Sequence, residues 1–362
     1  MHIGIVTSWA TDVIDGSGTA VFFNSFLGGL REQGVQVEVI APNFDSTDYL
    51  TVTLQRFLFN AELRTDPRLR DMDVIIGFDY DGYALDAATR PPLIVSAHCL
   101  YADVVPWERD PIRTMVMAQG FYDQVNMERG DHVTVASAYG KQRIQELYGI
   151  PAEKITVIPH GFHHPSWFPY AEGESHQAND HPVILAVGKM FPRKRIELLL
   201  RAIPILQMAY PDVEVRIVGN GLEWDSLHEL AATLKVEENL TWLSHLSDDR
   251  AFAREWQRAD VFCHPSSQES FGYVYLEAMA LGKPIVATNA SAAPEVVGDA
   301  GLLVPPENPE ALAEGILTFL NDTALRETYG QRGKERVRRF TEKAMIDGYL
   351  GLLNTLTHEP IG

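Results

Sequence analysis

The fold is decided by a strand–helix–strand pattern in residues 260–289, which read DVFCHPSSQESFGYVYLEAMALGKPIVATN. The apolar runs at its two ends predict buried strands, and the middle predicts a helix that begins near Gly272 and stops at Gly282. Two parallel strands joined by a helix are the repeating unit of doubly wound α/β sheets. Glu269, before the helix, and Glu277, inside it, are unexpected here because carboxylates are seldom buried without a partner.

The same alternation of strand-like runs and helix-compatible segments extends along the whole chain. The polar stretch 169–182 interrupts it, has little that could be buried and is typical of a linker. The chain is therefore predicted to be α/β, with two doubly wound, Rossmann-like domains at 1–170 and 171–342. The predicted strands are 3–8, 35–42, 73–79, 92–98, 132–137 and 155–161 in the first domain and 182–189, 213–221, 240–246, 260–266 and 284–289 in the second.

Composition excludes several classes of function. The net charge of −19 in 362 residues argues against binding to nucleic acid or to anionic membranes. No apolar run reaches about 18 residues, so no transmembrane helix is expected, and the N-terminus is too mixed for a secretory signal. The two cysteines, Cys99 and Cys263, lie far apart, which argues against a disulfide framework and fits a cytoplasmic location.

Residues 55–70, QRFLFNAELRTDPRLR, are a local exception to this acidity. Such a mixture of basic and apolar residues is compatible with contact with a lipid surface. A solvated helix or loop beside a core aromatic cluster is the favoured interpretation. The arginines are Arg56, Arg64, Arg68 and Arg70, and they flank Phe57, Leu58 and Phe59.

Residues that follow strands are the candidates for function, because doubly wound sheets bind ligands beyond the carboxyl ends of their strands. Two such domains facing each other would form a cleft. Glu269 falls at such a strand end, and the amides of the next three residues would be unpaired donors of the first helical turn. As the simpler alternatives, Glu269 is a helix-start carboxylate favoured by the helix dipole, and Glu277 points to solvent. Because the two carboxylates flank a Phe-Gly turn, we favour a functional site.

The eight-residue spacing of Glu269 and Glu277 resembles the E-x7-E signature of retaining nucleotide-sugar glycosyltransferases with two-domain GT-B architecture, most closely glycosyltransferase family four. Residues 264–313 resemble the C-terminal core of that family, 157–169 its interdomain entry and 184–202 its phosphate-binding strand and helix. The resemblance is specific over most of 130–340 and looser before it. It implies a donor-binding C-terminal domain, an acceptor-side N-terminal domain and a last helix, about 343–362, that packs back on the first domain.

The resemblance also implies roles for the two glutamates. Glu269 would lie at the reacting sugar and Glu277 at the nucleotide ribose. A carboxylate accepts hydrogen bonds from sugar hydroxyls, and in a cleft it stabilises a developing oxocarbenium charge. Backbone contacts to the donor sugar and phosphate would come from Ser270, Phe271, Gly272 and Tyr273.

Lys189 and Lys194 resemble the Arg/Lys pair with which the family binds the donor diphosphate. Two cations there would neutralise the leaving group without a metal ion. The sequence departs from the family at Lys189, where arginine is usual, and at Arg195, where glycine is usual. The first change loses bidentate geometry, and the second is expected to crowd the site or to add charge to it. Surface lysines on a basic turn are the alternative.

Three further residues match the family more weakly. Gly18 resembles the glycine loop over the donor phosphates, or is a plain helix N-terminus. A dinucleotide fingerprint fails because Val21 replaces its third glycine. His98 resembles a histidine near the donor sugar, or is a structural histidine at a strand end. Asn220 resembles the loop below the nucleotide base, or a plain turn.

Two possible metal sites are disfavoured. Asp79-Tyr80-Asp81 has the D-x-D form of the metal site of another glycosyltransferase architecture, but at a strand end it is better explained as loop capping. Cys99 beside His98 and Cys263 beside His264 could form a split metal site, yet lone strand-end cysteines are far commoner.

The resemblance thus implies a retaining, metal-independent glycosyltransferase without a cofactor. It would move a hexose from a nucleoside diphosphate sugar, by default UDP-glucose, to a hydroxyl acceptor. Acidity favours a soluble sugar or metabolite as acceptor, and residues 55–70 leave a lipid open. The alternatives are a nucleotide-sugar epimerase of the same architecture and a non-catalytic sugar-nucleotide binding protein.

Overall fold

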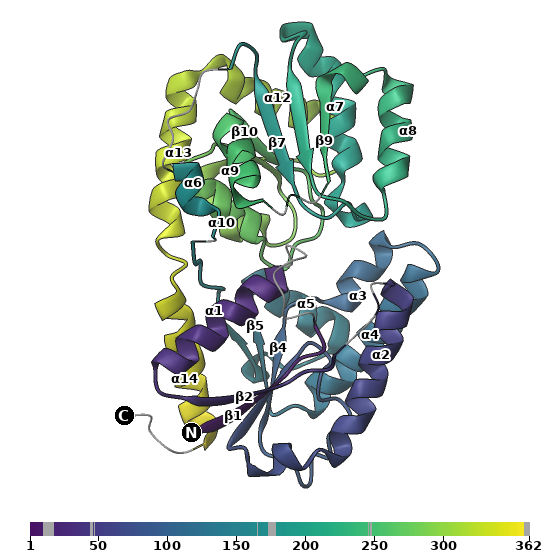
Figure 1. The fold of residues 1–362 in the computed structure, drawn as a ribbon, viewed down its shortest axis with the longest axis vertical. Coiled ribbons are helices and arrows are strands. Elements are labelled where there is room, and N and C mark those ends of the chain that lie inside the picture. Colours follow the sequence, from purple (N-terminus) through teal and green to yellow (C-terminus); the bar gives the residue numbers. More distant parts are fainter. Residues whose placement is uncertain are drawn as a thin grey trace. The chain divides into compact units, whose positions relative to one another are not determined.

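A computed structural model describes residues 1–9, 18–43, 46, 48–164, 166–172, 179–244, 246 and 248–357. The chain divides into two compact units (Figure 1), unit 1 with Met1–Gly161 and Phe340–Gly362, and unit 2 with Phe162–Arg339. The described residues of each unit form a six-stranded sheet, and helices cover both faces of each sheet. The predicted α/β class with two Rossmann-like domains is confirmed. The predicted domain limits, after 170 and 342, lie several residues beyond these divisions.

In unit 1 the described strands follow the order β2-β1-β3-β4-β5-β6, and every pair is parallel. The two central strands, β3 and β4, are buried along their whole length, which explains their unbroken apolar runs. Because the strand order reverses at β1, the carboxyl ends of β1 and β3 flank the switch point where such sheets bind ligands. The strands are β1 (His2–Val6), β2 (Gln36–Ile40), β3 (Val74–Phe78), β4 (Leu93–Ala97), β5 (His132–Val135) and β6 (Ile155–Val157).

The helices of unit 1 include the last helix of the chain, α14 (Glu342–Thr357), which packs against α1 (Gly18–Glu32). The rings of Phe26 and Tyr349 lie 4.5 Å apart across this contact. The remaining helices are α2 (Tyr49–Glu62), α3 (Tyr101–Val104), α4 (Ile112–Arg129) and α5 (Ala138–Tyr148), with 3-10 turns η2 (Leu63–Thr65), η3 (Pro67–Asp71), η4 (Val105–Trp107) and η5 (Ala152–Lys154).

In unit 2 the described strands follow the order β12-β11-β10-β7-β8-β9, again all parallel, so the order reverses between β7 and β10. The edge strand β12 is missing from the predicted strands; it starts at a glycine and is only partly buried, so its pattern is weak. The strands are β7 (Val183–Val187), β8 (Glu214–Val218), β9 (Leu240–Leu243), β10 (Val261–His264), β11 (Ile285–Thr288) and β12 (Gly301–Val304).

In unit 2, helix α10 (Tyr273–Ala280) is the next element after β10, where the sequence predicts it. The others are α6 (Phe168–Glu172), α7 (Ile196–Ala209), α8 (Trp224–Leu234), α9 (Asp249–Arg258), α11 (Ala293–Val297), α12 (Pro309–Asn321) and α13 (Thr323–Val337), with 3-10 turns η6 (Pro192–Lys194), η7 (Glu237–Asn239) and η8 (Gly298–Ala300).

The predicted linker at 169–182 is partly wrong. Its first residues belong to α6, which packs on α9, and Phe168 is buried. The preceding Trp167 stacks on Trp256, with ring centroids 5.9 Å apart and nearly parallel planes. Aromatic burial therefore fixes this end of the stretch to unit 2, whereas residues 173–178 lie outside the described residues.

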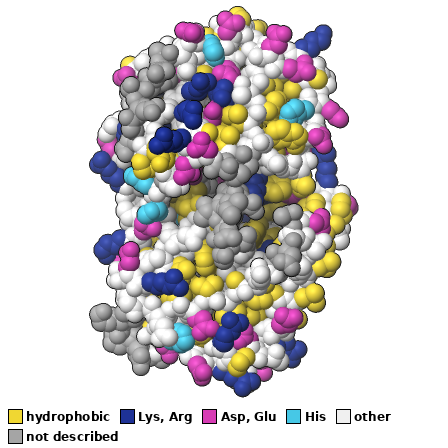
Figure 2. Space-filling view, in the orientation of Figure 1, with side chains coloured by type: hydrophobic (Ala, Val, Ile, Leu, Met, Phe, Trp, Pro, Cys, Tyr) yellow, Lys and Arg dark blue, Asp and Glu magenta, His cyan; other side chains and the backbone are white. Residues whose placement is uncertain are grey.

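The surface agrees with the acidic composition. Figure 2 shows basic and acidic side chains interspersed on the visible face, without a continuous basic surface. Among the described residues, no helix is long and apolar enough to cross a membrane.

Candidate functional site

The loop between β10 and α10 holds Glu269 in a fixed backbone position. Its amide donates to Ser291 Oγ at 2.9 Å, and its carbonyl accepts from the Ala292 amide at 3.2 Å, so the loops after β10 and β11 are tied together. Gly272 then caps the helix with a φ of 93°, and a Cβ there would lie 2.6 Å from Tyr275 Cδ2. Only glycine allows this turn, which delivers Glu269 to the carboxyl end of the sheet.

The Glu269 carboxylate is buried, with 8% of the residue exposed, and lies between two nitrogen donors. His264 Nε2 donates to Oε1 at 2.7 Å, and Lys194 Nζ donates to the same oxygen. Burial alone would raise the pKa of Glu269, but the charge of Lys194 and the hydrogen bond from His264 outweigh it and hold the pKa well below its ordinary value. The group is therefore ionised, and within the described chain its Oε2 accepts no hydrogen bond.

The two lysines of the predicted pair differ in their partners. Lys194, at the end of η6, forms the ion pair with Glu269. Lys189, two residues after β7, is exposed, and in the described part of the chain its ammonium makes no hydrogen bond or ion pair. An ammonium group has three donors, so Lys194 can keep Glu269 and still bind another anion. The site therefore offers one paired and one unpaired cation to an anionic ligand.

Asn220 lies in the loop next to that of Lys189. The Met190 amide donates to the Asn220 carbonyl at 2.9 Å, and a Cβ on Gly219 would lie 2.0 Å from the Gly188 carbonyl oxygen. The loops after β7 and β8 therefore pack backbone against backbone. The Asn220 side chain is exposed.

Arg195 occupies the position where the family usually has glycine, and its backbone is left-handed with a φ of 53°. Its guanidinium bonds to Glu307, with Nε 2.9 Å from Oε1, and to Glu197, with Nη1 2.7 Å from Oε1. Ser267 Oγ also donates to Glu307, at 3.1 Å. The expectation that Arg195 adds charge to the site is not supported, because two carboxylates of unit 2 compensate its charge.

Glu277 lies in α10 and is half-buried. Its carboxylate makes no hydrogen bond or ion pair with any part of the chain that the structure describes, and burial raises the pKa of this group to about 7. The predicted backbone contacts lie just before it, where the Phe271 and Tyr273 side chains are buried and pack edge to face at 5.9 Å. Ser270 is half-buried in the same turn.

In unit 1, His98 follows β4. Its amide donates to Asp79 Oδ1 at 2.7 Å, and its Nε2 lies 3.0 Å from Ser96 Oγ. Burial and the neighbouring His160 lower the pKa of His98 well below its ordinary value, so the ring is neutral. Its Nδ1 is buried without a hydrogen-bond partner among the described residues.

The Asp79-Tyr80-Asp81 turn is explained by capping. Asp79 accepts from the amides of His98 and Cys99, and from Trp9 Nε1 at 2.6 Å. Asp81 accepts from the Ser8 amide at 2.6 Å, from the Ser8 hydroxyl at 2.6 Å and from Asn60 Nδ2 at 2.7 Å. These hydrogen bonds fix loops of unit 1 to one another, as expected for a structural turn.

Gly18, a predicted site residue, and Cys263, part of the disfavoured metal site, make none of the contacts described above. Gly18 is the first residue of α1, and the preceding Gly16 and Ser17 lie outside the described residues. Cys263 is in the core of unit 2, where burial raises the pKa of its thiol, while the adjacent His264 points to Glu269. Adjacent strand residues face opposite sides of a sheet, which argues against a metal site made from this pair.

The residues missed by the sequence interpretation are Ser291 and the role of His264. His264 was considered only as a metal ligand beside Cys263. Its position as the last residue of β10 was the available signal, because side chains at the carboxyl end of a strand reach the same edge as the following loop.

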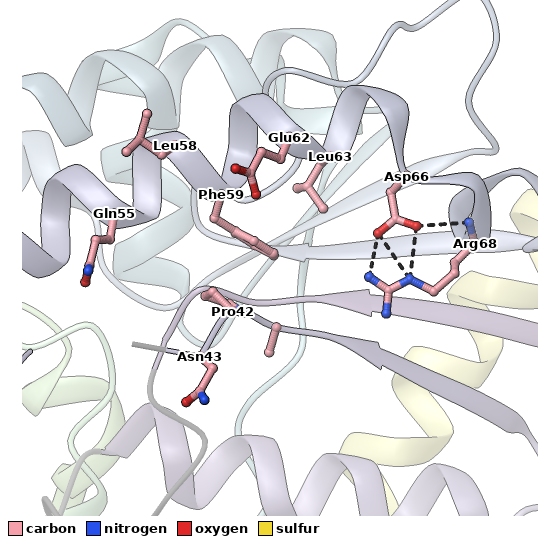
Figure 3. Close-up of a pocket in the computed structure, with 10 residues that line it drawn as sticks. Pro42, Asn43, Gln55, Leu58, Phe59, Glu62, Leu63, Asp66 and Arg68 are labelled. Atoms are coloured by element: carbon pink, nitrogen blue, oxygen red, sulfur yellow. Dashed lines mark hydrogen bonds and ion pairs between the residues drawn. The ribbon is translucent and has the colours of Figure 1, made fainter. Parts of the chain in front are cut away.

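A pocket of about 420 Å3 in unit 1 lies beside the edge strand β2, and none of the predicted site residues lines it (Figure 3). Leu58 and Phe59 from α2 border it, together with the Asp66–Arg68 ion pair. The neighbouring Arg56 is buried, with its guanidinium over the rings of Trp9 and Tyr80, so it is not a surface cation. Residues 55–70 therefore present fewer surface cations than their sequence suggests, and these ring contacts agree with the favoured interpretation of a helix or loop beside a core aromatic cluster.

Two family models match the chain. One is described as Glycosyl transferases group 1 and covers residues 171–336; the other, described as Glycosyltransferase Family 4, covers residues 16–164. With the two parallel sheets, these matches show that the chain resembles glycosyltransferases of GT-B architecture and of family four, as the sequence predicts.

Two relatives in sequence and one solved structure illustrate this resemblance. The phosphatidyl-myo-inositol mannosyltransferase of Mycolicibacterium smegmatis is 42% identical over 152 residues, which are 41% of this chain and 38% of that protein. A GDP-mannose-dependent alpha-(1-6)-phosphatidylinositol monomannoside mannosyltransferase of the same species is 29% identical over 218 residues, 56% of each protein. The chain thus spans only 38% and 56% of these relatives. Sucrose-phosphate synthase from Thermosynechococcus elongatus shares the fold, with a TM-score of 0.80 at 20% identity over 99% of both chains.

Proposed function

We propose that this chain transfers a hexose from a nucleoside diphosphate sugar to a hydroxyl acceptor, with retention at the anomeric carbon and without a metal ion. The bond from the anomeric carbon to the leaving phosphate oxygen breaks, and the acceptor oxygen bonds to that carbon on the same face. The acceptor proton passes to the leaving phosphate. Unit 2 binds the donor, and unit 1 offers the acceptor surface.

The observation that best supports this proposal is the ionised Glu269 carboxylate between Lys194 and His264. Its unpaired Oε2 can accept a sugar hydroxyl and stabilise positive charge on the reacting sugar. The adjacent lysine can bind the diphosphate at the same time, so charge develops between groups already in place. Lys189 supplies a second cation, which makes a metal ion unnecessary for neutralising the leaving group.

The names of two relatives guide the choice of candidate donors and acceptors. The names of the two mycobacterial proteins point to GDP-mannose and to phosphatidylinositol compounds, whereas UDP-glucose is the default donor from the sequence. Glu277 and Asn220 would contact the nucleoside. We infer a nucleotide hexose donor and an acceptor that carries a polyol ring, either soluble or as a lipid headgroup.

The test is a donor panel of GDP-mannose and UDP-glucose, each with myo-inositol or with phosphatidylinositol in neutral vesicles. We expect nucleoside diphosphate release that depends on acceptor, and a product with the donor's anomeric configuration. Glu269→Gln keeps the shape of the side chain and removes its charge, so this variant tests whether turnover depends on the charge. Donor binding without turnover over a broader set of acceptors would support a binding protein instead, and a C2-epimerised sugar an epimerase. Activity abolished by a chelator and restored by manganese would contradict the metal-independent mechanism.

A further inference from the structure

The side chains of His264 and Glu269 meet at the carboxyl end of β10. His264 is the last residue of that strand, and its Nε2 lies 2.7 Å from Glu269 Oε1. The two residues are 1% and 8% exposed, so little water reaches the contact. Hydrogen bonds to an ionised group are stronger than those between neutral groups, and burial strengthens them further. This bond therefore holds the carboxylate from the side of the sheet.

The chemistry of the two groups decides which nitrogen of His264 carries the hydrogen. Burial lowers the pKa of His264 below its ordinary value, so the ring is neutral and has one N–H. The ionised Glu269 carboxylate can only accept hydrogen bonds. The hydrogen is therefore on Nε2, and Nδ1 is bare. In agreement with this tautomer, Nδ1 is buried and has no hydrogen-bond partner among the described residues.

Of the two donors to Glu269 Oε1, only His264 is held rigidly. Its ring is nearly parallel to that of Phe262, with centroids 5.9 Å apart, and meets the Tyr275 ring edge to face at 5.3 Å. Lys194, the other donor, has a flexible stem, and the three hydrogens of its ammonium group set no single direction. Lys194 can therefore follow a carboxylate that turns, whereas the His264 ring cannot.

The orientation of the Glu269 carboxylate matters because its two oxygens have different surroundings. Oε1 receives the hydrogen bonds from His264 and Lys194, and Oε2 receives none within the described chain. The last torsion of a glutamate side chain is broad, so an ammonium group alone leaves the carboxylate plane variable. A donor fixed in the core restricts that torsion and keeps Oε2 in one direction.

We propose that His264 is a positioning residue: its Nε2–H holds the Glu269 carboxylate in the orientation in which Oε2 contacts the sugar donor. This inference rests on the proposed function, which gives Glu269 that substrate. It adds that the charge of Glu269 is not sufficient for turnover, because a rigid donor has to aim the carboxylate.

Three substitutions separate this role from packing. Glutamine carries an amide N–H about as far from the backbone as histidine Nε2, asparagine carries the same amide one methylene shorter, and phenylalanine keeps a ring without a donor. With GDP-mannose or UDP-glucose, His264→Gln should keep kcat within about threefold of the wild type. His264→Asn and His264→Phe should each lower kcat about tenfold, with donor KM within about twofold. A ring needed only for packing would instead make His264→Phe the most active of the three.

A second background and a remote histidine serve as controls. The effect of His264→Phe should disappear in Glu269→Ala, because a residue that acts through Glu269 has nothing to position there. His132 begins β5 in unit 1, and its Nε2 lies 2.8 Å from Thr156 Oγ1. His132→Phe also removes a hydrogen-bonded histidine and should leave kcat unchanged. Wild-type kcat in a folded His264→Phe, or losses that add in the double variant, would overturn the proposal.

NMR of the chain without ligand separates this inference from the proposed function. Labelling with 15N-histidine should show a protonated Nε2 and a bare Nδ1 on His264, and Glu269→Ala should abolish this pattern. The 13C relaxation of the Glu269 Cγ methylene should show a rigid side chain in the wild type and in His264→Gln, and a mobile one in His264→Asn. If these results hold while no donor is turned over, His264 orients Glu269 and the proposed function is wrong. A bare Nε2, or equal relaxation in the Gln and Asn variants, would contradict the inference whatever the turnover.

Discussion

The two units place buried carboxylates at the ends of their strands and use them differently. In unit 1, the two oxygens of Asp81 accept three hydrogen bonds, from Ser8 and Asn60. These bonds use most of the capacity of the carboxylate to accept hydrogen bonds from a ligand. In unit 2, Glu269 receives both of its donors at one oxygen and leaves the other open. A strand-end carboxylate satisfied by backbone and fixed side chains is structural, whereas one held at a single oxygen can still bind a substrate.

The pKa values of the buried carboxyl groups also differ between the two units. Burial raises the pKa of Asp81, although Arg56 opposes it, and raises that of Asp79 to about 6. Burial acts on Glu269 too, but there the charge of Lys194 prevails and the pKa falls. Similar burial therefore gives opposite pKa shifts, and the close ammonium group of Lys194 is what keeps the Glu269 carboxylate ionised.

Removal of Glu269 should have the largest effect on activity. In the proposed mechanism Glu269→Ala removes the carboxylate that stabilises the reacting sugar, and it breaks the ion pair with Lys194, so kcat/KM should fall at least about a hundredfold. Steady-state release of nucleoside diphosphate measures it, and circular dichroism checks the fold. Turnover within about threefold of the wild type would remove Glu269 from the site.

The two lysines should differ because only one of them touches Glu269. Lys194→Ala should lower turnover about a hundredfold, since it removes a proposed phosphate ligand and also the positive charge that lowers the pKa of Glu269. Lys189→Ala should raise donor KM about tenfold with a smaller change in kcat, as expected for the loss of one charge-assisted contact. Lys235→Ala, remote in sequence on the C-cap of α8, is the control. Equal effects of the two site lysines would contradict this division of roles.

The sequence predicts most of the fold and part of the site. Buried parallel strands have continuous apolar runs, which is why β3 and β4 were recognised, whereas the half-buried β12 and the short α6 were not. Motif spacing identified Glu269 and Lys194 separately, but their ion pair joins residues 75 positions apart. No local pattern encodes such a pair, and none shows that the Asp81 oxygens are already occupied.

Asp81 should matter for stability instead of catalysis. In Asp81→Asn, an amide replaces a carboxylate that accepts three hydrogen bonds, so at least one buried donor loses its acceptor. The free energy of unfolding should fall by about 1–3 kcal/mol in urea titrations. Turnover per folded molecule should stay within about threefold of the wild type. A hundredfold loss of turnover in a stably folded variant would place Asp81 in the active site and end the contrast with Glu269.

Glu277 should make donor binding depend on pH near neutrality. Its folded pKa is about 7, and only the ionised form accepts hydrogen bonds from both ribose hydroxyls. Donor KM should therefore fall about fivefold from pH 6 to pH 8 and become flat in Glu277→Gln. For stability the sign is opposite: the folded chain binds the proton more tightly, so this group makes the protein less stable as pH rises from 4.5 to 7. A pH-independent KM in the wild type would contradict a role at the ribose.

Arg195→Gly should have the smallest effect, because it changes a residue whose charge is already compensated. The substitution removes ion pairs to Glu307 and Glu197, partly exposed contacts worth about 0–1 kcal/mol each. It also relieves a left-handed backbone, which stabilises by about 1 kcal/mol in compensation. Thermal stability and turnover should both stay near wild type, within about threefold for kcat/KM. Arg195→Ala is the matched control, since it loses the same pairs but keeps the strain, and it should unfold at a lower temperature than Arg195→Gly. A loss of turnover above about thirtyfold in Arg195→Gly, with the fold intact, would mean that this guanidinium binds the donor diphosphate beside Lys194.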